Sequence, residues 1–331
     1  MDDIAKALGV SKGTVSKALS GAEDVSQAMR KLVVEKAVEM GYTRIMRSGT
    51  SRKICILVVH MKYENPGDFG YDIVTGFRKM AEPAGYIVDV VRLSEQMQQE
   101  CSYDQFMLRE NYQGAFILAM AYADPWAGSL SSCRTPAVLL DNHIAGNPAV
   151  THVGVDNREG MHMAVEYLYS LGHRRIGYLS SLMDSYVFQQ RYQAFFDALR
   201  HCGLPDDPAL AANERDRADC IRVHLPRLVR EEGCTAVLCC HDILARDVVE
   251  SASSFGLRVP QDVSIIGFDD IPLCLETRPT LTTVRQDRTQ LGKSAFYALQ
   301  SQIGGTPIST LMLHASLAVR ESTAPAPAKA D

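Results

Sequence analysis

Short apolar runs of strand length recur along most of this chain, and helix-like stretches separate them. These runs lie at residues 54–59, 87–91, 115–120, 137–140, 176–180, 236–240 and 263–268. Strands that are apolar on both faces and alternate with helices are typical of parallel sheets that helices cover on both sides. The pattern contains too many βα units for one small open sheet, and a chain of 331 residues predicts two or three folding units.

Polar residues collect directly after several strand-like runs. Ligands of open α/β sheets bind beyond the carboxyl ends of the strands, so we expect a ligand site to draw on these residues. They are His60, Asp141 and Asn142, Asp156 and Asn157, His241 and Asp242, and Asp269 and Asp270.

The first forty residues have a different pattern, which predicts three short helices. We expect Asp3 to cap the first helix, which Gly9 ends, and Ser11 to cap the second, where Val10 packs against Val15. A third helix is predicted from apolar residues at helical spacing. It follows Ser26, contains Met29, Leu32, Val33, Ala37 and Met40, and ends at Gly41.

Two short helices joined by a glycine turn are the layout of a helix-turn-helix, whose second helix enters the major groove of DNA with its N-terminal end. Lysine side chains there donate to guanine edges or phosphates, and hydroxyl groups donate to phosphates. The alternative is a helical pair that packs on another surface, with Ser11 as a structural cap. The candidate DNA contacts are Ser11, Lys12, Gly13, Thr14, Ser16 and Lys17.

Charge is unevenly distributed along the chain. Residues 1–53 hold ten Lys and Arg against six Asp and Glu, a net charge of +4, whereas the whole chain carries −5 and the remainder therefore −9. This asymmetry suggests that only the basic segment approaches a polyanion, although +4 is also compatible with an ordinary solvated surface. Residues 43–53 read as a basic linker, and Arg44 and Arg47 are further candidate DNA contacts.

The sequence gives no sign of a membrane segment or of catalytic chemistry. No run of about eighteen apolar residues and no signal-peptide layout occurs, so a cytoplasmic protein is expected. The nine cysteines lack regular spacing and are expected to be reduced thiols. The dense group Cys-Cys-His-Asp at 239–242 follows a strand, where neighbouring side chains point to opposite faces, so we expect no metal there. Without a phosphate-binding glycine loop or a nucleophile elbow, we expect no cofactor and no enzyme activity.

Several motifs occur in a characteristic order. In the first part of the chain they are Asp3-Ile4-Ala5, Val10-Ser11, Thr14-Val15-Ser16, Leu19, Val25-Ser26, Arg30 and Gly41-Tyr42. Further on they are DNREG at 156–160, LGHRRI at 171–176, VPQDVSIIGFDD at 259–270 and PTLTTV at 279–284. With these motifs the chain, from Asp3 to about Glu321, strongly resembles the lactose-repressor (LacI) family of bacterial regulators.

The resemblance implies a fold class and a domain organisation. We expect an all-α helix-turn-helix head at 1–42, a linker at 43–53, and an α/β sensor region at 54–323 similar to the two-lobed, type I periplasmic sugar-binding proteins. By analogy one lobe comprises about 54–153 and 288–313, and the other about 154–287 and 314–323. The Ala/Pro-rich residues 324–331 are predicted to form a disordered tail.

The resemblance also implies effector contacts. Asp141, Arg191 and Asp269 fall on positions that contact effectors in the family, and their charges suit directional hydrogen bonds to a hydroxyl-rich ligand. For each of them an ion pair or a strand-end cap within the protein is the alternative. His241 stands where relatives commonly carry Asn, which implies a different hydrogen-bond pattern and is compatible with pH sensitivity.

Aromatic residues near the predicted strand ends are candidates for stacking on a sugar ring. Trp126, the only tryptophan, follows a strand end, but a core or helix-start role is equally compatible with the sequence. Tyr186 lies in a loop that lines the ligand cleft in relatives. Phe69 and Tyr71, after the first strand, are weaker candidates.

The linker departs from the family pattern. After Tyr42 it lacks the usual Pro-Asn and the Ala-Arg-x-Leu helix whose leucines wedge into the minor groove, so a DNA-bending wedge is not predicted. The resemblance still implies a homodimeric, sequence-specific transcription regulator, by analogy a repressor, that binds a roughly palindromic operator under control of a sugar-like effector. A solute-binding receptor without DNA function would share the sensor region but would have no use for residues 1–42.

Overall fold

The computed structural model describes residues 1–20, 22, 24–42, 52–181 and 185–327, which form two compact units. The first unit comprises residues 1–62, 72–153 and 289–311, and the second comprises 63–71, 154–288 and 312–331. Unlike the lobes expected from the resemblance, residues 63–71 cluster with the second unit, and the first unit includes the N-terminal head.

The head contains the three predicted helices, α1 (Asp2–Leu8), α2 (Lys12–Ser20) and α3 (Gln27–Glu39). Gly9 ends α1 in the left-handed conformation with φ 66°, and the Ser26 side chain caps α3 by accepting from the Met29 amide. Our expectation for Asp3 is wrong, because α1 begins at Asp2 with Met1 as its N-cap. Asp3 lies instead in the first turn, where a negative charge favours the positive end of the helix dipole.

One apolar cluster holds the three short helices together. Helices of this length are marginal alone, so their stability comes from this packing. The buried residues contributed by the head are Ile4, Ala5, Val15, Ala18, Leu19, Val33, Val34 and Ala37.

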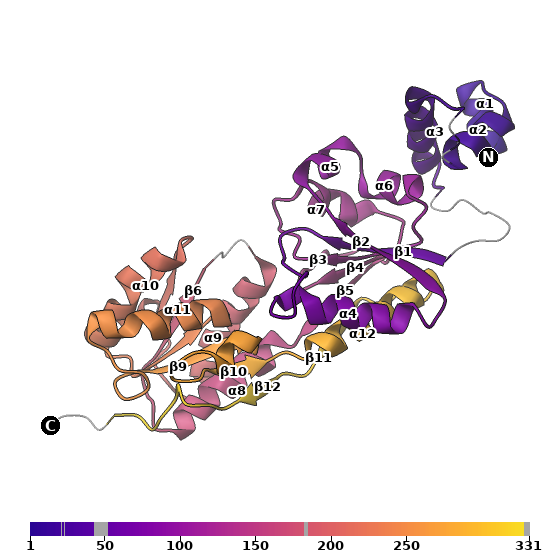
Figure 1. Ribbon diagram of the computed structural model, residues 1–331. Helices are drawn as coiled ribbons and strands as arrows, with labels where there is room; N and C mark the ends of the chain where they lie inside the picture. Colours follow the sequence, from indigo (N-terminus) through magenta and orange to yellow (C-terminus); the bar gives the residue numbers. More distant parts are fainter. Residues whose placement is uncertain (21, 23, 43–51, 182–184, 328–331) are drawn as a thin grey trace. The chain divides into compact units, whose positions relative to one another are not determined.

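The rest of the first unit is built on a six-stranded sheet with the order β11-β5-β4-β3-β1-β2, and β1 to β5 run parallel where they pair (Figure 1). Its strands are β1 (Arg52–Val58), β2 (Tyr86–Arg92), β3 (Ala115–Leu118), β4 (Ala137–Leu140), β5 (Val150–Val155) and β11 (Thr310–Leu313). Its helices are α4 (Phe69–Ala81), α5 (Glu95–Glu100), α6 (Tyr103–Arg109), α7 (Pro125–Ser129) and α12 (Arg288–Ile303), with a 3-10 turn η1 at Leu130–Ser132.

Helices cover both faces of this sheet, as the apolar runs predict. Alternate strand residues such as Leu57 and Ile117 join a cluster with the side chains of α6 and α7. On the other face Phe116 stacks on Phe77 of α4 at 5.3 Å between ring centroids, and Phe77 meets Phe296 of α12 edge to face.

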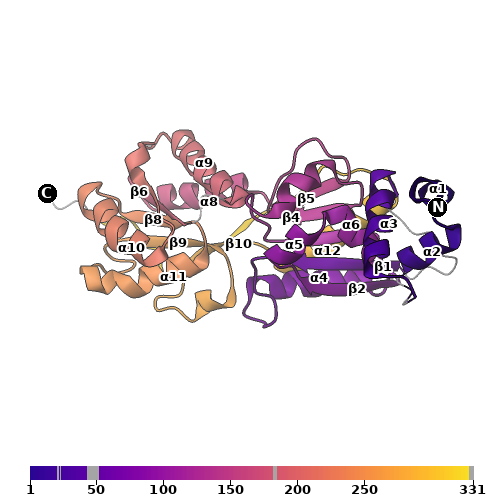
Figure 2. The same cartoon turned by 90° about the horizontal axis from the view of Figure 1, so that it is seen from above.

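The second unit repeats this arrangement with the strand order β12-β10-β9-β8-β6-β7, parallel except for β12 against β10. Helices α8 and α9 pack together on one side of the sheet, and α10 and α11 pack together on the other (Figure 2). The strands are β6 (Ile176–Ser180), β7 (Ala211–Asn213), β8 (Ala236–Cys239), β9 (Ser264–Asp269), β10 (Thr282–Arg285) and β12 (Ser316–Ala318). The helices are α8 (Asn157–Ser170), α9 (Tyr186–His201), α10 (Arg217–Pro226) and α11 (Asp242–Ser251), with short turns η2 (Pro208–Leu210), η3 (Arg227–Glu231), η4 (Ala252–Phe255) and η5 (Pro272–Leu275).

The prediction that residues 324–331 form a disordered tail is wrong for the first residues of this segment. The Ala324 carbonyl lies 3.0 Å from Nε2 of buried His173, and the Ala326 amide donates to the Leu171 carbonyl at 2.9 Å. These contacts tie the Ala/Pro-rich segment to the turn after α8, so composition alone was misleading. Residues 328–331 lie outside the described residues. Among the residues described, we find no helix with the length and apolar character needed to cross a bilayer.

Close packing of α4 on α12 gives a test of the fold. A Cβ on Gly292 would lie 2.0 Å from the Ile73 carbonyl oxygen and 2.8 Å from the Phe77 amide nitrogen. Because these are backbone atoms, Gly292→Ala should lower the free energy of unfolding by about 1 to 3 kcal/mol in urea titrations. Gly128→Ala, where a Cβ meets nothing within 4 Å, is the control and should change stability little. Equal stability of the two variants would contradict this packing.

Candidate functional site

Helix α2 presents the predicted polar residues on its solvent side. Lys12, Ser16 and Lys17 are exposed, as are Ser11 and Gly13 just before and within the first turn, whereas Thr14 is half-buried. The opposite side of α2 lies in the core of the head. Packing therefore fixes which side chains of the helix face outward.

Ser11 is the cap that the sequence predicts for α2. Its Oγ accepts from the Thr14 amide at 3.0 Å and lies 2.9 Å from Thr14 Oγ1. The cap satisfies one of the free amides at the start of the helix. It also fixes the direction of the lysine-bearing end of α2.

The two lysines form exposed ion pairs in this structure. Lys12 Nζ lies 2.9 Å from Asp2 Oδ2, and Lys17 pairs with Asp24. Exposed pairs of this kind contribute little stability, so both ammonium groups can exchange these carboxylates for phosphates or base edges at low cost. The other two candidates, Arg44 and Arg47, lie outside the described residues, as does most of the linker.

In the second unit, the buried guanidinium of Arg191 joins three segments. Its side chain is 2% exposed, and Nε donates to Asn157 Oδ1 at 2.9 Å. Its Nη1 donates to the Cys240 carbonyl at 2.5 Å, and Nη2 lies 3.5 Å from Asp269 Oδ1. The guanidinium carbon lies 3.6 Å from the centroid of the Phe268 ring, a cation–π contact. Arg191 and Asp269, both predicted effector contacts, are thus brought together.

Asp269 begins a turn with unusual backbone geometry. Asp269 has φ 122° and Asp270 has φ 53°, values that side-chain-bearing residues seldom adopt. The side-chain Nε2 of Gln286 donates to Asp269 Oδ1 at 2.7 Å. Burial raises the pKa of Asp269, while Arg191 and Gln286 act against this rise by stabilising the charged form.

His241 caps α11 and stays neutral near physiological pH. Its Nδ1 accepts from the Leu244 amide at 3.0 Å, so the remaining ring proton is assigned to Nε2, which lies 3.3 Å from Ser181 Oγ. Burial, aided by Arg191 and Arg217, lowers the pKa of His241 to about 4. The expected pH sensitivity of His241 near neutrality is therefore not supported.

The aromatic candidates differ in their surroundings. Trp126 is 1% exposed, meets Tyr103 edge to face, and donates from its indole nitrogen to the Cys101 carbonyl at 2.8 Å. The stacking role considered for Trp126 is therefore wrong, because no face of its ring is accessible, and it is a core residue. Tyr186, at the start of α9, and Phe69, which packs on the core of the second unit, are half-buried.

Asp141 and Tyr71 are two further predicted effector contacts. Asp141 follows β4 in the first unit with φ 52°, and its amide donates to the Val153 carbonyl at 3.0 Å. Tyr71 is half-buried near the start of α4.

Sequence reasoning missed Gln286 and Phe188 of the Arg191 cluster, whereas Asn157 is one of the strand-end residues on which a ligand site was expected to draw. Gln286 lies just beyond β10 without an obvious motif. Phe188 lies on α9, three residues before Arg191, with its ring centroid 5.7 Å from the guanidinium carbon. This helical spacing was a usable signal for Phe188, whereas Gln286 needed knowledge of the sheet order.

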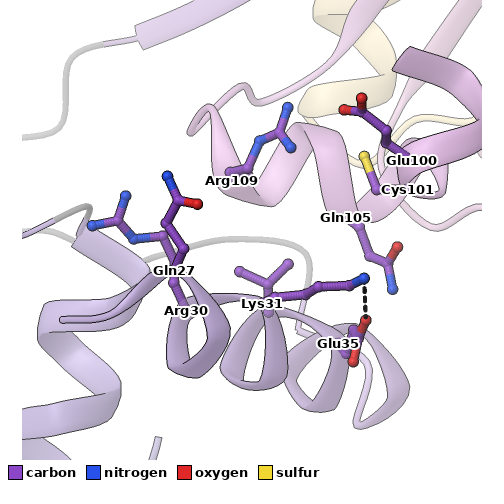
Figure 3. A pocket seen from close by; sticks show the side chains of 9 residues that line it. Gln27, Arg30, Lys31, Glu35, Glu100, Cys101, Gln105 and Arg109 are labelled. Carbon is purple, nitrogen blue, oxygen red and sulfur yellow. Dashed lines mark ion pairs between the residues drawn. The ribbon is translucent and has the colours of Figure 1, made fainter. Parts of the chain in front are cut away.

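A pocket of about 430 Å³ lies elsewhere, between α3 and the α5–α6 region (Figure 3). Its charged lining includes both signs, and Lys31 pairs with Glu35. None of the predicted effector contacts lines it. Within the described part of the chain, no group of three or more His, Cys, Asp and Glu side chains is arranged to hold a metal ion.

Comparison with known families assigns both regions. Residues 1–44 match the model described as bacterial regulatory proteins, lacI family, and residues 165–323 match a periplasmic binding protein-like domain. The chain is 31% identical to the HTH-type transcriptional repressor CytR of Escherichia coli (strain K12), over 98% of this chain and 96% of that protein. It is 29% identical to the HTH-type transcriptional regulator MalR of Streptomyces coelicolor, with the same shares covered.

Solved structures have the same fold. A transcriptional regulator CelR–cellobiose complex superposes with a TM-score of 0.71 at 26% identity, covering 96% of this chain and 98% of that one. The lac repressor dimer bound to operator and the anti-inducer ONPF superposes with a TM-score of 0.67 at 23% identity, covering 97% and 98%.

The neutral, capping state of His241 predicts a pH effect. Because the unfolded chain binds a proton on this residue near pH 6.5 and the folded chain only near 4, stability falls as the pH drops between these values. His241→Asn keeps an acceptor for the Leu244 amide and should remove about 1 to 3 kcal/mol of this loss, measured by urea unfolding at several pH values.

His201→Asn, an exposed position on α9, is the control for this experiment and should not remove the loss of stability that His241 causes. An identical profile for wild type and His241→Asn would show that His241 is protonated normally in the folded protein.

Proposed function

The chain belongs to the LacI family of bacterial regulatory proteins, and from this premise we propose that its effector is a sugar-like compound bound at Arg191 and Asp269. The protein is a DNA-binding transcription regulator controlled by a small-molecule effector. The proposal concerns the chemistry of that effector and the residues that contact the effector and the operator.

The observation that carries the effector proposal is the pairing of Arg191 with Asp269 at the carboxyl end of β9. Guanidinium and carboxylate groups form strong, directional hydrogen bonds with sugar hydroxyls, donating and accepting respectively. Half-buried Phe188 adds apolar surface beside them, the usual combination in a small-molecule site. The cellobiose in the CelR complex, a structure with the same fold as this chain, is a ligand of this class.

We also propose that the exposed end of α2 reads the operator. Ser11, Lys12, Gly13, Thr14, Ser16 and Lys17 would contact DNA, with the lysines facing base edges or phosphates. Arg44 and Arg47 stay predictions on the linker. In a homodimer two such heads would bind two half-sites of a roughly palindromic operator.

Exposed apolar side chains on the second unit support a second copy of the chain as a partner. Val223 on α10, Ile243 on α11 and Leu275 in η5 are 45%, 37% and 60% exposed. Helix α11 packs against both α10 and η5, and exposed apolar side chains on a protein surface favour association.

Lys17→Ala tests the operator contact. With an operator selected from random duplexes, the substitution should weaken specific binding by about 1 to 3 kcal/mol in gel-shift titrations if Lys17 contacts a base edge. Lys6→Ala removes the same charge from α1 and should cost less. If Lys17→Ala weakens binding equally on every duplex, Lys17 contacts phosphate only.

Arg191→Lys tests the effector site. Lysine keeps the charge next to Asp269 but lacks the planar fork, so it should lose a charge-assisted hydrogen bond of about 1.5 to 3 kcal/mol. In a thermal-shift screen against a panel of sugars that includes cellobiose, at least one sugar should raise the melting temperature of the wild type. Arg191→Lys should need at least about tenfold more of this sugar for the same shift.

Arg200→Lys, an exposed position on the same helix, is the matched control and should respond to the sugar as the wild type does. Operator binding without sugar should be the same for both variants. An unchanged sugar response in Arg191→Lys would remove Arg191 from the site, and a panel without any stabilising sugar would contradict the proposed effector class.

A further inference from the structure

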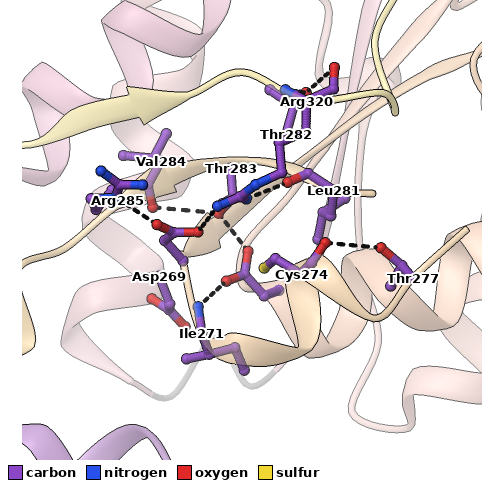
Figure 4. A network of polar contacts seen from close by, with 12 residues as sticks. Asp269, Ile271, Cys274, Thr277, Leu281, Thr282, Thr283, Val284, Arg285 and Arg320 are labelled. Atoms are coloured by element: carbon purple, nitrogen blue, oxygen red, sulfur yellow. Dashed lines mark hydrogen bonds and ion pairs between the residues drawn. The ribbon is translucent and has the colours of Figure 1, made fainter. Parts of the chain in front are cut away.

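Asp242, the first residue of α11, is fully buried beside the Arg191 cluster. Its Oδ1 accepts from Thr283 Oγ1 at 2.5 Å, and its Oδ2 accepts from the Ile271 amide at 3.0 Å. Figure 4 shows Thr283 and Ile271 with Asp269 and Cys274 in this network. One carboxyl group therefore connects the start of α11 to β10 and to the turn after β9.

That turn is the one that carries Asp269. Ile271 follows two consecutive residues, Asp269 and Asp270, whose positive φ angles are costly for residues with side chains. Such a turn persists only where its surroundings hold it, and the bond from the Ile271 amide to Asp242 is one such restraint. Gly267 on β9 leaves the space that this arrangement needs, because a Cβ there would lie 2.2 Å from Asp242 Oδ1.

The arginine side chains around this turn pair with Asp269 and Asp270. Arg191 faces Asp269, and Arg285 and Arg320 both pair with Asp270. The recorded hydrogen-bond donors to Asp242 are uncharged: the Thr283 hydroxyl, the Ile271 amide and the Cys274 thiol. Its sequence neighbour His241 is neutral above about pH 4, and buried Cys239 and Cys274 stay protonated because their pKa values are raised.

Burial and the negative charge of Asp269 together raise the pKa of Asp242 to about 7. Arg191 stabilises a negative charge on Asp269, whereas the hydrogen-bond donors to Asp242 are uncharged. When the carboxyl groups of Asp242 and Asp269 hold one proton between them, that proton therefore resides on Asp242.

We propose that Asp242 is a positioning residue of the effector site, which holds the Asp269–Ile271 turn in place and, by gaining or losing its proton, controls how readily Asp269 carries a negative charge. The relevance to the effector rests on the function proposed above. The arrangement itself concerns the ligand-free protein, in which it can be measured.

The proton on Asp242 should be linked to effector binding. Effector hydroxyls that donate to Asp269 favour its charged form, and exclusion of water by the effector strengthens the repulsion between two carboxylates. Binding therefore favours the protonated form of Asp242. Effector affinity should fall as the pH rises through about 7, the value at which Asp242 ionises.

The test follows the carboxyl carbons of the full-length, ligand-free protein, labelled with ¹³C-aspartate, by NMR from pH 5 to pH 9. We expect one buried carboxyl to titrate near pH 7 in the wild type, to be missing in Asp242→Asn and to persist in Asp247→Asn. Asp247, on the same helix, is the matched control because it pairs with Arg217 and lies outside the network.

The same spectra test the control of Asp269, whose signal is assigned with Asp269→Asn. In Asp242→Asn the carboxyl of Asp269 should ionise at lower pH than in the wild type, because the neighbouring acid is gone. An unchanged midpoint of Asp269, or the absence of any aspartate that titrates near neutrality, would overturn the proposal.

Hydrogen exchange of the Ile271 amide tests the positioning role. The asparagine side chain can still accept from this amide, so Asp242→Asn should keep its protection, whereas Asp242→Ala should speed its exchange about tenfold. Equal exchange rates in the alanine variant and the wild type would rule out positioning by Asp242.

If Asp242→Asn or Asp242→Ala does not fold, the titration of Asp242 is measured in Thr283→Val instead. This substitution removes the hydroxyl that stabilises the charged form, so the titration of Asp242 should move to higher pH. A midpoint that does not move would count against the proposal. Because none of these measurements uses a sugar, their outcome is independent of the effector screen.

Discussion

The hydrogen bonds of the buried Arg191 guanidinium are the interaction on which the end of the second unit with the proposed effector site depends. They connect the start of α8 through Asn157, the end of β8 through Cys240 and the end of β9 through Asp269. A buried charge needs several well-placed partners, because losing any of them leaves part of its desolvation cost uncompensated. The positions of three strand and helix ends are therefore linked through one side chain, and a ligand that contacts Arg191 or Asp269 acts on all three segments.

The Arg191 cluster also explains why the surrounding polar groups are neutral. Burial and Arg191 keep His241 uncharged, and burial together with the charge of Asp269 raises the pKa of Asp242 and favours its protonated form. Arg285 and Arg320 pair with Asp270 and therefore compensate neither His241 nor Asp242. Burial and the Arg191–Asp269 pair together favour the neutral forms of these two residues.

Much of this architecture could be predicted from apolar runs in the sequence. The runs at 137–140 and 176–180 coincide with β4 and β6, because uninterrupted apolar strands of parallel sheets differ clearly from helices and loops. β5 was not singled out, since Thr151 and His152 interrupt its apolar character, and Thr151 is accommodated by donating to the Ile308 carbonyl. Arg191 and Asp269 were found through the family resemblance, whereas the role of Asp242 depends on β9, β10 and α11 meeting in three dimensions. Trp126 shows the converse error, because a position after a strand end does not tell which way a side chain points.

Ser11 caps α2 and is also a proposed DNA contact, which has a consequence for how binding specificity can evolve. Its Oγ already accepts a bond from the Thr14 amide, so replacing Ser11 with a residue that cannot cap a helix also lowers stability. Lys12, Ser16 and Lys17 carry no such structural duty, since they lie outside the core of the head. Divergence toward new target sequences is therefore least costly at these three positions, while position 11 is held to the few side chains that cap a helix.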